Sequence, residues 1–469
     1  MKTENKKTNI PEGWTMTTLG DIAEEITYGY TESAKKEKIG PKFLRITDIQ
    51  DDFIDWKTVP YCFISEKDYF KYKLEIGDIV IARTGNSTGA ISTIKEEVNA
   101  VFASYLIRFK INQEKADYKF IDLLLRSEIW KNFVKSIKGG SAQGGANAKN
   151  FAEFSILLPI LPEQQAIAAV LSSLDEKIEL LREQNKTLEA IAQAIYKRWF
   201  VDFEFPIEDE TSKLPSLKGG EPEGRGGFDN ALQLKGYKSR GGKMVESELG
   251  EIPEGWKVGK LSDIIIFKKE KFKKNIEWKY KKLIALNYMP NFSMCINNFG
   301  EGLDFKTNVY KLDEYDLLYG SIRPYFGKAG FSPISGAVAG TVFQFIPNKK
   351  EYFSLALLFL TSKEFINYTI ANSKGTKMPI ICKDDILDYD IIVPPQNILN
   401  DFNSIILSLV KHIKNNISQI QTLSRLRDSL LPKLMSGKIR VPTTPSAGGC
   451  HPSLTEGERK SENPQTEGE

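Results

Sequence analysis

Histidine is almost absent from this 469-residue chain, which carries only His412 and His451, both near its C-terminal end. Most of the chain therefore lacks the imidazole that serves as general base or metal ligand, which argues against hydrolysis that depends on histidine or zinc. Cysteine is nearly as rare, and no CxxC pair occurs, so we expect free thiols and no metal site. The four cysteines are Cys62, Cys295, Cys382 and Cys450.

Long apolar runs are also missing. No stretch reaches the roughly 18 apolar residues of a membrane helix. The N-terminal residues 1–10 are polar and lack the apolar core of a signal peptide. We therefore expect a soluble, cytoplasmic protein.

Sequence motifs of the obvious DNA-acting enzymes are lacking as well. A DNA adenine methyltransferase would need an Asn/Asp-Pro-Pro-Tyr/Phe motif, and residues 287–290 and 393–396 only approach it. A P-loop would need a different spacing from that of Gly320 to Lys328. No Pro-Asp dipeptide of a nuclease site occurs. The sequence therefore predicts a protein without catalytic residues of its own.

What the chain does contain is an internal repeat. Residues 10–14 read IPEGW and recur at 252–256. Further on, 77–90 parallels 315–330, since each is an apolar run followed by a Gly-punctuated loop that carries an arginine. Each half also has a loop rich in Gly, Lys and Ser before an apolar strand that stops at proline, at 138–159 and 373–394. These parallels predict two related globular units.

Each half ends in a long amphipathic helix. Apolar residues alternate steps of four and three for more than four heptads, which is typical of a coiled-coil seam. One such helix could simply cover its own domain, but two matched helices favour pairing with each other. The predicted seam comprises Ile167, Leu171, Leu174, Ile178, Leu181, Leu188 and Ile195 in the first helix and Phe402, Ile406, Leu409, Ile413, Ile420, Leu423 and Leu430 in the second.

Polar residues interrupt both seams. Asn185 and Arg427 either set the register of the pair or mark places where the seam frays. Pro432 is expected to kink or end the second helix, with Gly437 as its latest stop.

The predicted fold class is α+β, with two mixed α/β domains separated by two long helices that pair as an antiparallel coiled coil with pseudo-two-fold symmetry. The predicted parts are a first domain at 10–160, a helix at 161–205, a linker at 206–250, a second domain at 251–394, a helix at 395–441 and a disordered tail at 442–469. The net charge of +3 is only mildly basic, so it permits nucleic-acid binding without demanding it.

The Gly-rich loops have side chains suited to DNA. Arg suits guanine edges, Asn suits adenine, and glycine lets backbone N–H groups approach phosphates. Each loop alone is more typical of a solvated turn than of a DNA-binding site, but matching loops recur in both halves. The candidate DNA-binding residues are Arg83, Thr84, Asn86, Ser87, Lys138, Ser141, Gln143 and Lys149 in the first half and Arg323, Tyr325, Lys328, Lys374 and Lys377 in the second.

Two diverged readers at opposite ends of a helical rod would read a bipartite, asymmetric target. Two DNA sites one helical turn apart lie on the same face of the duplex, about 34 Å from each other, and a protein helix of this length could bridge that distance.

Taken together, these motifs resemble those of the specificity subunits of type I restriction-modification systems. The resemblance is carried by the ordered, duplicated segments IPEGW at 10–14 and 252–256, KMVESELG at 243–250, LPEQQ at 161–165, YKRWFVDF at 196–203 and LPKLMSG at 431–437. The start of the second helix, at 394–402, and the acidic tail depart from the usual pattern.

The resemblance implies two target recognition domains that read double-stranded DNA and a scaffold for partner subunits. Two modification (methyltransferase) subunits and restriction (helicase-nuclease) subunits would dock on it. S-adenosylmethionine, ATP and Mg²⁺ would be used by these partners and not by this chain. The alternative is a stand-alone coiled-coil protein that binds DNA or has a structural role.

Overall fold

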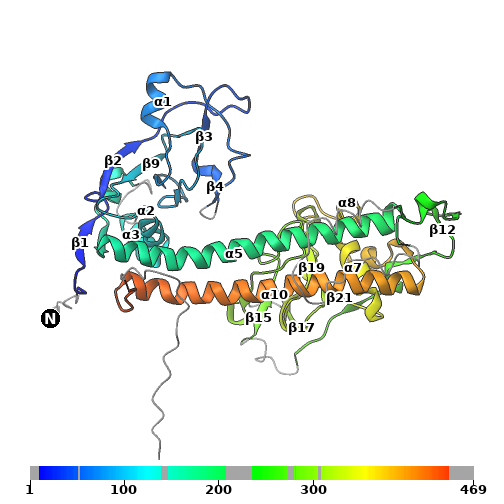
Figure 1. The fold of residues 1–469 in the computed structure, drawn as a ribbon. Helices are drawn as coiled ribbons and strands as arrows, with labels where there is room; N and C mark the ends of the chain where they lie inside the picture. Colours follow the sequence, from blue (N-terminus) through cyan, green and yellow to red (C-terminus); the bar gives the residue numbers. More distant parts are fainter. Residues whose placement is uncertain are drawn as a thin grey trace, which may run out of the picture. The chain divides into compact units, whose positions relative to one another are not determined.

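The computed structural model describes residues 10–50, 53–138, 146–206, 235–272, 279, 281–304 and 308–442. It divides into two compact units, which both mix helices and strands (Figure 1). Unit 1 combines residues 1–173 with 428–469, and unit 2 spans 174–427. The division crosses the long helices α5 (Leu161–Tyr196) and α10 (Gln396–Met435), so each unit holds a segment of both.

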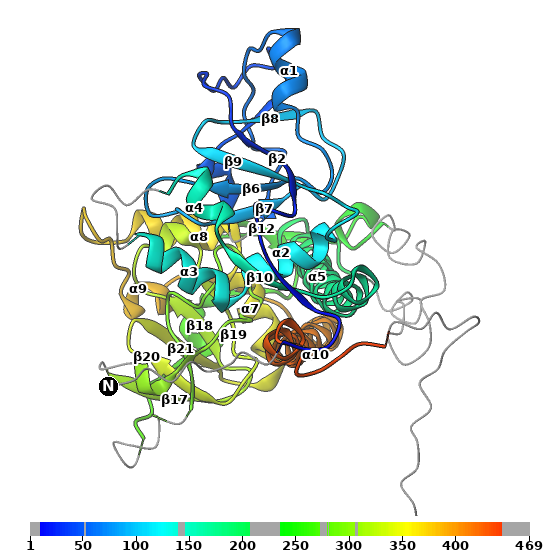
Figure 2. The ribbon, with the colours of Figure 1, turned by 90° about the vertical axis from the view of Figure 1, so that its left-hand side faces the viewer.

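Unit 1 contains a sheet of order β2-β9-β6-β7, a parallel pair β3-β8 and an antiparallel pair β1-β10 (Figure 2). Its strands are β1 Thr15–Thr18, β2 Ala23–Tyr28, β3 Lys42–Leu44, β4 Ile49–Gln50, β5 Phe53–Ile54, β6 Ile79–Ala82, β7 Ile91–Thr93, β8 Ala100–Phe102, β9 Leu106–Ile111 and β10 Ser155–Leu158. Its shorter helices are η1 Ile46–Asp48, α1 Glu66–Tyr72, α2 Tyr118–Arg126, α3 Glu128–Lys138 and α4 Ala148–Ala152.

Unit 2 repeats this plan with a sheet of order β14-β21-β18-β19, a parallel pair β15-β20 and an antiparallel pair β13-β22. Its strands are β11 Met244–Ser247, β12 Gly250–Pro253, β13 Lys257–Lys260, β14 Ile265–Lys268, β15 Lys282–Ile284, β16 Gly300–Glu301, β17 Val309–Leu312, β18 Leu317–Gly320, β19 Ala329–Phe331, β20 Gly336–Ala339, β21 Val342–Pro347 and β22 Asp390–Val393. Its shorter helices are η2 Lys197–Val201, η4 Lys238–Arg240, η5 Leu261–Asp263, η7 Gly302–Asp304, η8 Pro324–Phe326, η9 Lys350–Tyr352, α7 Phe353–Leu360, α8 Lys363–Ala371 and α9 Lys383–Leu387.

The internal repeat of the sequence therefore extends to strand pairing. The matched segments 77–90 and 315–330 hold the hairpins β6-β7 and β18-β19. The matched segments 138–159 and 373–394 end in a short helix and an edge strand, α4-β10 and α9-β22. The two halves share an order of elements although few of their residues are identical.

The central strands β6 and β18 are buried on both faces, which explains their uninterrupted apolar runs. Successive side chains of a strand point to opposite faces. Ile79 and Ile81 accordingly join one hydrophobic cluster while Val80 joins another. Leu317 and Leu318 are divided between two clusters in the same way.

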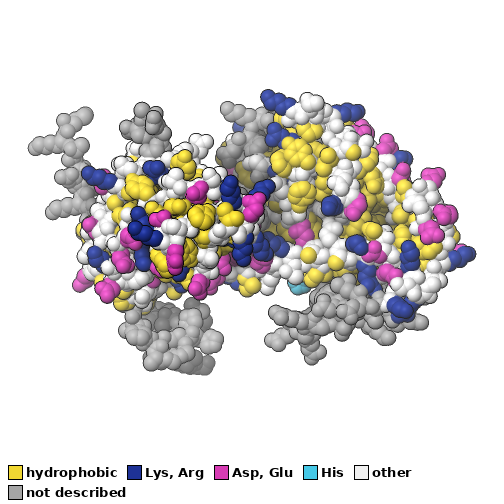
Figure 3. Space-filling model, turned by 90° about the horizontal axis from the view of Figure 1, so that it is seen from above, with side chains coloured by type: hydrophobic (Ala, Val, Ile, Leu, Met, Phe, Trp, Pro, Cys, Tyr) yellow, Lys and Arg dark blue, Asp and Glu magenta, His cyan; other side chains and the backbone are white. Residues whose placement is uncertain are grey.

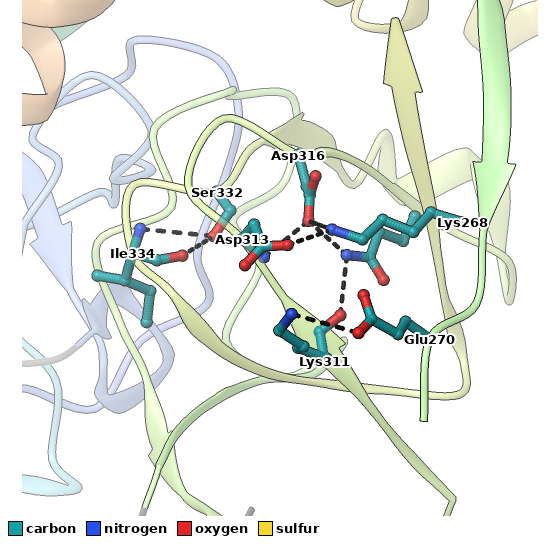
Figure 4. A network of polar contacts seen from close by, with 8 residues as sticks. Lys268, Glu270, Lys311, Asp313, Asp316, Ser332 and Ile334 are labelled. Carbon is teal, nitrogen blue, oxygen red and sulfur yellow. Dashed lines mark hydrogen bonds and ion pairs between the residues drawn. The ribbon is translucent and has the colours of Figure 1, made fainter. Parts of the chain in front are cut away.

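A buried acid lies just before the central strand in each unit. In unit 2, the Oδ2 atom of Asp316 lies 2.9 Å from Lys268 Nζ and accepts hydrogen bonds from Gln344 Nε2 and from the Asp313 backbone N–H (Figure 4). Gln344 also donates to the Lys311 carbonyl over 3.0 Å. A cation on β14 and an amide on β21 thus compensate this carboxylate.

In unit 1, the corresponding acid is Asp78, which accepts from the Glu75 backbone N–H over 2.9 Å. Arg108, opposite Val80 on β9, stands where unit 2 has Gln344 opposite Leu318 on β21. Its Nη1 atom donates to the Lys73 carbonyl at 2.8 Å and lies 3.7 Å from the Asp78 carboxylate. Burial raises the pKa of Asp78 to about 6, although the Glu75 N–H and Arg108 both act to lower it.

The long helices contact each other through polar pairs in unit 2. Asn416 Nδ2 donates to Asn185 Oδ1 over 2.9 Å, and Arg427 Nη1 donates to Asp175 over 2.8 Å. From Asp175 to Asn185 the residue number rises along α5, while the partner's number falls along α10, from Arg427 to Asn416. These two segments therefore run antiparallel. Both interruptions of the predicted seam are therefore paired side chains and not frayed ends.

Most predicted seam residues are buried, and Leu174, Leu188, Leu423 and Leu430 are half-buried. The sequence missed Val410 and Ile417, which are as buried as the seam positions beside them. They were missed because α10 also packs on the domain of unit 2, and this widens its apolar face beyond a strict heptad stripe.

The ends of both long helices differ from the prediction. The first helix was expected to continue to 205, but α5 ends at Tyr196 and the short π-helix η2 follows, because buried aromatic packing of Trp199 and Phe200 overrides the regular helix. The second was expected to reach 441. It passes Pro432 and ends at Met435, before Gly437 at φ 68°.

In unit 1, the start of α5 and the chain after α10 meet at one buried carboxylate. Glu163 accepts from Trp14 Nε1 over 3.0 Å and from Arg440 Nη2 over 2.7 Å. The Arg440 guanidinium also lies over the Trp14 ring and donates to the Glu12 carbonyl. The first IPEGW motif is thereby fixed both to the first turn of α5 and to the chain that follows α10.

In unit 2, the second IPEGW motif is held by aromatic packing instead. The Trp256 ring contacts Phe200, Phe203 and Phe205, and Phe205 stacks on Tyr237 at 4.7 Å. The segment 206–250 was predicted to be a linker throughout. That is wrong for 235–250, because this part forms η4 and the β11-β12 hairpin, while 207–234 lies outside the described residues.

Replacing Glu163 tests whether its hydrogen bonds to Trp14 and Arg440 stabilise unit 1. Glu163→Ala leaves the buried Trp14 N–H without an acceptor, so we expect the free energy of unfolding of unit 1 to fall by about 1–3 kcal/mol. Glu163→Gln keeps an acceptor and should lose less. Hydrogen exchange of the β1 and β10 amides measures this unit separately. The surface variant Glu128→Ala serves as control. An equal effect of both alanine variants would contradict a stabilising role of the Glu163 hydrogen bonds.

The raised pKa of Asp78 predicts a pH dependence of stability. Its folded pKa of about 6 lies above the ordinary aspartate value of 3.8, so the native state binds the proton more tightly than the unfolded state does. The associated stability is complete below about pH 4 and is lost as the pH rises through 6, by up to about 3 kcal/mol. Asp78→Asn should remove this loss, measured as hydrogen exchange of unit 1 from pH 4 to 7. Parallel profiles for the variant and the wild type would refute it.

Candidate nucleic-acid interface

The first candidate loop closes the β6-β7 hairpin of unit 1. Its ends are joined by the hydrogen bond from Gly89 N to Ala82 O at 2.8 Å. Gly85 and Gly89 adopt φ values of 69° and 86°. A Cβ atom on Gly89 would lie 2.5 Å from Val134 of α3, so only glycine allows this close approach. The loop is therefore seated against α3, with Asn86 and Ser87 exposed.

Arg83 is held at the base of this loop. Its Nε atom donates to the Ser104 carbonyl over 3.0 Å, and its guanidinium lies 5.2 Å from the centre of the Tyr28 ring. The Arg83 side chain is half-buried. The sequence analysis missed Tyr28, because it lies on β2, far from the loop in sequence, and no local pattern indicates its contact with Arg83.

The second candidate loop of unit 1 returns to the first. The Ala146 backbone N–H donates to the Arg83 carbonyl over 3.0 Å, and Ala148 N–H donates to the Tyr28 hydroxyl over 2.9 Å. Lys138 Nζ reaches the Asn86 carbonyl at 3.4 Å. Lys149 is exposed on α4, and Thr84 is half-buried. The predicted residues Ser141 and Gln143 lie outside the described residues.

Unit 2 brings its two candidate loops together in the same manner. Arg323 N–H donates to the Pro379 carbonyl over 2.7 Å, and Ile381 N–H donates to the Ser321 carbonyl over 3.0 Å. Arg323 has φ 53°, a rare conformation for a residue with a side chain, and is exposed. Lys374 pairs with Ile380 through both backbone hydrogen bonds.

The remaining candidate residues of unit 2 differ in their exposure and in their hydrogen bonding. Tyr325 is exposed and packs on Phe326 with ring centres 4.7 Å apart, while Lys377 and Lys374 are exposed. Lys328 instead donates to the Leu286 carbonyl over 2.5 Å, and burial lowers its pKa. Its ammonium group is thus engaged in holding the loop to the body of the unit.

The surface chemistry is mixed. Figure 3 shows Lys and Arg side chains interspersed with Asp and Glu on the face that it draws. Among the described residues, no group of three or more His, Cys, Asp or Glu side chains could hold a metal ion. In that same part of the chain, no helix is long and apolar enough to cross a membrane. The hydrogen-bonded loop pairs of the two units form the candidate site.

Comparisons with known proteins agree on one family. The family model described as type I restriction modification DNA specificity domain matches residues 11–190 and 253–426, once in each half. The MjaIX type I restriction enzyme specificity subunit of Methanocaldococcus jannaschii is 29% identical, over 94% of this chain and 97% of its own. The HindI specificity subunit of Haemophilus influenzae is 24% identical, over 91% and 99%.

A solved structure shares the fold. The type I restriction-modification S subunit from M. genitalium covers 92% of this chain and 98% of its own, with 16% sequence identity and a TM-score of 0.50.

Proposed function

Because the chain belongs to the family of type I restriction-modification DNA specificity subunits, we propose that it selects the DNA sequence on which such a system acts. The observation that carries this proposal is the repeated loop pair. The strand order is the same in both units, and a corresponding loop-to-loop hydrogen bond joins each pair, from Ala146 N–H to the Arg83 carbonyl in unit 1 and from Ile381 N–H to the Ser321 carbonyl in unit 2. Each first loop carries an arginine, Arg83 at its base in unit 1 and Arg323 two residues beyond the corresponding position in unit 2. The chain itself then has a non-catalytic role.

The two loop pairs present different side chains, so they would read different bases. Unit 1 offers an arginine held over a tyrosine ring with Asn86 and Ser87 beside it. Unit 2 offers an exposed arginine and tyrosine next to Lys374 and Lys377. Such readers would recognise a bipartite and asymmetric double-stranded target.

The long helices would space the readers. We propose recognition domains at 10–160 and 251–394, with α5 and α10 pairing as an antiparallel coiled coil with pseudo-two-fold symmetry. Helices of 36 and 40 residues are about 54 and 60 Å long, at a rise of roughly 1.5 Å per residue. That length exceeds the roughly 34 Å between equivalent positions on one face of DNA.

The proposed partners are two modification subunits, which would use S-adenosylmethionine, and restriction subunits, which would use ATP and Mg²⁺. The complex would act on DNA in the cytoplasm. This chain would scaffold these subunits and bind none of these cofactors.

A stand-alone coiled-coil protein that binds DNA or has a structural role is the less favoured alternative. It would account for the long helices but not for two family matches that each cover a domain with its own loop pair. A neighbouring gene for an adenine methyltransferase would separate the two, since only a specificity subunit requires one.

Arginine substitutions test the proposed readers. Arg83→Ala should relax discrimination in one half of the target by about 1–3 kcal/mol, and Arg323→Ala should do so in the other half. Competition binding of variant duplexes to the full-length chain with its modification subunits measures both. Lys95→Ala, at the opposite end of β7, is the matched control. If both arginine variants affect the same half-site, the assignment of one half to each unit is wrong.

A charge in the helical seam tests the scaffold. Ile178 is buried with Leu181 and Ile420, so Ile178→Asp places a carboxylate in an apolar contact at a cost of several kcal/mol. We expect loss of co-purification with modification subunits while near-ultraviolet spectra still report folded domains. Thr187→Asp adds the same charge at an exposed position of α5. Full assembly of the Ile178→Asp chain would place the seam elsewhere.

A further inference from the structure

Phe292 lies in the loop between β15 and β16 of unit 2 in an unusual state. Its side chain is 67% exposed, and its backbone has φ 51°. Water disfavours an exposed phenyl ring, and steric repulsion disfavours positive φ for a bulky residue. A residue with both properties persists only where its neighbours determine its conformation, and such positions cluster at binding sites.

The neighbours of Phe292 fix it on both sides. Its backbone N–H donates to the Gly327 carbonyl over 3.1 Å. A Cβ atom on Gly327 would lie 2.5 Å from the Phe292 ring, so the ring rests against a position that must be glycine. On the other side, the half-buried Glu189 of α5 accepts through its carboxylate from Ser293 Oγ over 2.9 Å and from the Met294 backbone N–H.

Glu189 makes this arrangement stiff. Burial raises its pKa, while the hydrogen bonds from Met294, Ser293 and Cys295 lower it in part. These hydrogen bonds anchor the loop to the long helix, so the exposed ring is presented on a rigid support and not on a free tip.

Basic side chains and a candidate DNA-binding loop lie near Phe292. Gly327 belongs to the candidate loop that carries the exposed Arg323 and Tyr325. Beside Phe292 and Gly327 lies a cavity of about 830 Å³, and basic side chains line it from two helices. These are Arg182 and Lys186 of α5, which also pair with Glu179 and Glu183 of the same helix, and Lys363 of α8.

We infer that Phe292 is a base-contacting residue of unit 2 and that its ring packs on the C5-methyl group of a thymine in the major groove. Apolar side chains read thymine through this methyl group, whereas arginine and amide side chains read the polar edges. Phe292 supplies the apolar contact that the polar candidates of its neighbouring loop lack. The inference rests on the proposed function, because it requires unit 2 to read one half of the target.

The test replaces thymine by deoxyuridine, which removes only the methyl group. Once the gapped target is mapped, duplexes with single deoxyuridine substitutions are compared by competition binding to the full-length chain with its modification subunits. We expect one substitution in the half-site of unit 2 to weaken binding about fourfold, the value of one buried methyl group. Phe292→Asn should bind the two duplexes equally, since asparagine tolerates positive φ but lacks the ring.

Leu303→Asn is the control, because Leu303 is 63% exposed in the same unit. It should keep the wild-type response to deoxyuridine. A wild-type complex that binds no gapped sequence specifically would defeat the proposed function itself. Specific binding in which no thymine of that half-site responds, or in which Phe292→Asn responds as the wild type does, overturns only the role of Phe292. Loss of modification subunits from Phe292→Asn with unchanged base discrimination also overturns it and indicates a protein contact.

Discussion

The buried carboxylate of Glu163 is the constraint on which the arrangement of unit 1 depends. It lies in the first turn of α5, accepts a hydrogen bond from the tryptophan of the first IPEGW motif and binds Arg440 beyond the end of α10. A carboxylate that is 1% exposed is tolerable only with such partners. Segments more than 270 residues apart in sequence, including Glu163 and Arg440, are thereby required to meet. Unit 2 meets the same need at Trp256 with phenylalanine rings, so one motif is fixed by charge in one half and by apolar packing in the other.

The same divergence within a constant plan appears in the sheets. Each central strand follows a buried aspartate, but Asp78 is approached by Arg108 from β9, whereas Asp316 is compensated by Lys268 from β14 and by Gln344 from β21. The strand order is preserved because backbone pairing and burial define it. The cation beside the aspartate, in contrast, comes from β9 in unit 1 and from β14 in unit 2. The loops after these strands are free to differ further, and this freedom is what two different DNA half-sites would require of a specificity subunit.

Much of this could be predicted from sequence because it is periodic or repeated. The heptad stripes gave the long helices, and the duplicated IPEGW motifs gave the two halves. The end of α5 at Tyr196 could not be predicted, because packing of Trp199 on Phe402 decides it from across the fold. Neither could Tyr28 or Phe292, whose importance lies in contacts with Arg83 and Gly327 that no local pattern signals. The loop position of Lys328 predicts a DNA-binding side chain, and no local pattern signals its hydrogen bond to the Leu286 carbonyl.

A genome-wide map of methylated adenines in the host, with and without this gene, tests most directly whether the chain selects the DNA target. We predict that deletion removes one gapped motif with two unlike halves, and that a plasmid copy restores it. Modification subunits must be expressed in both strains, which immunoblotting verifies. If every methylated motif survives deletion while those subunits are present, the chain does not select their target, and the central claim is contradicted.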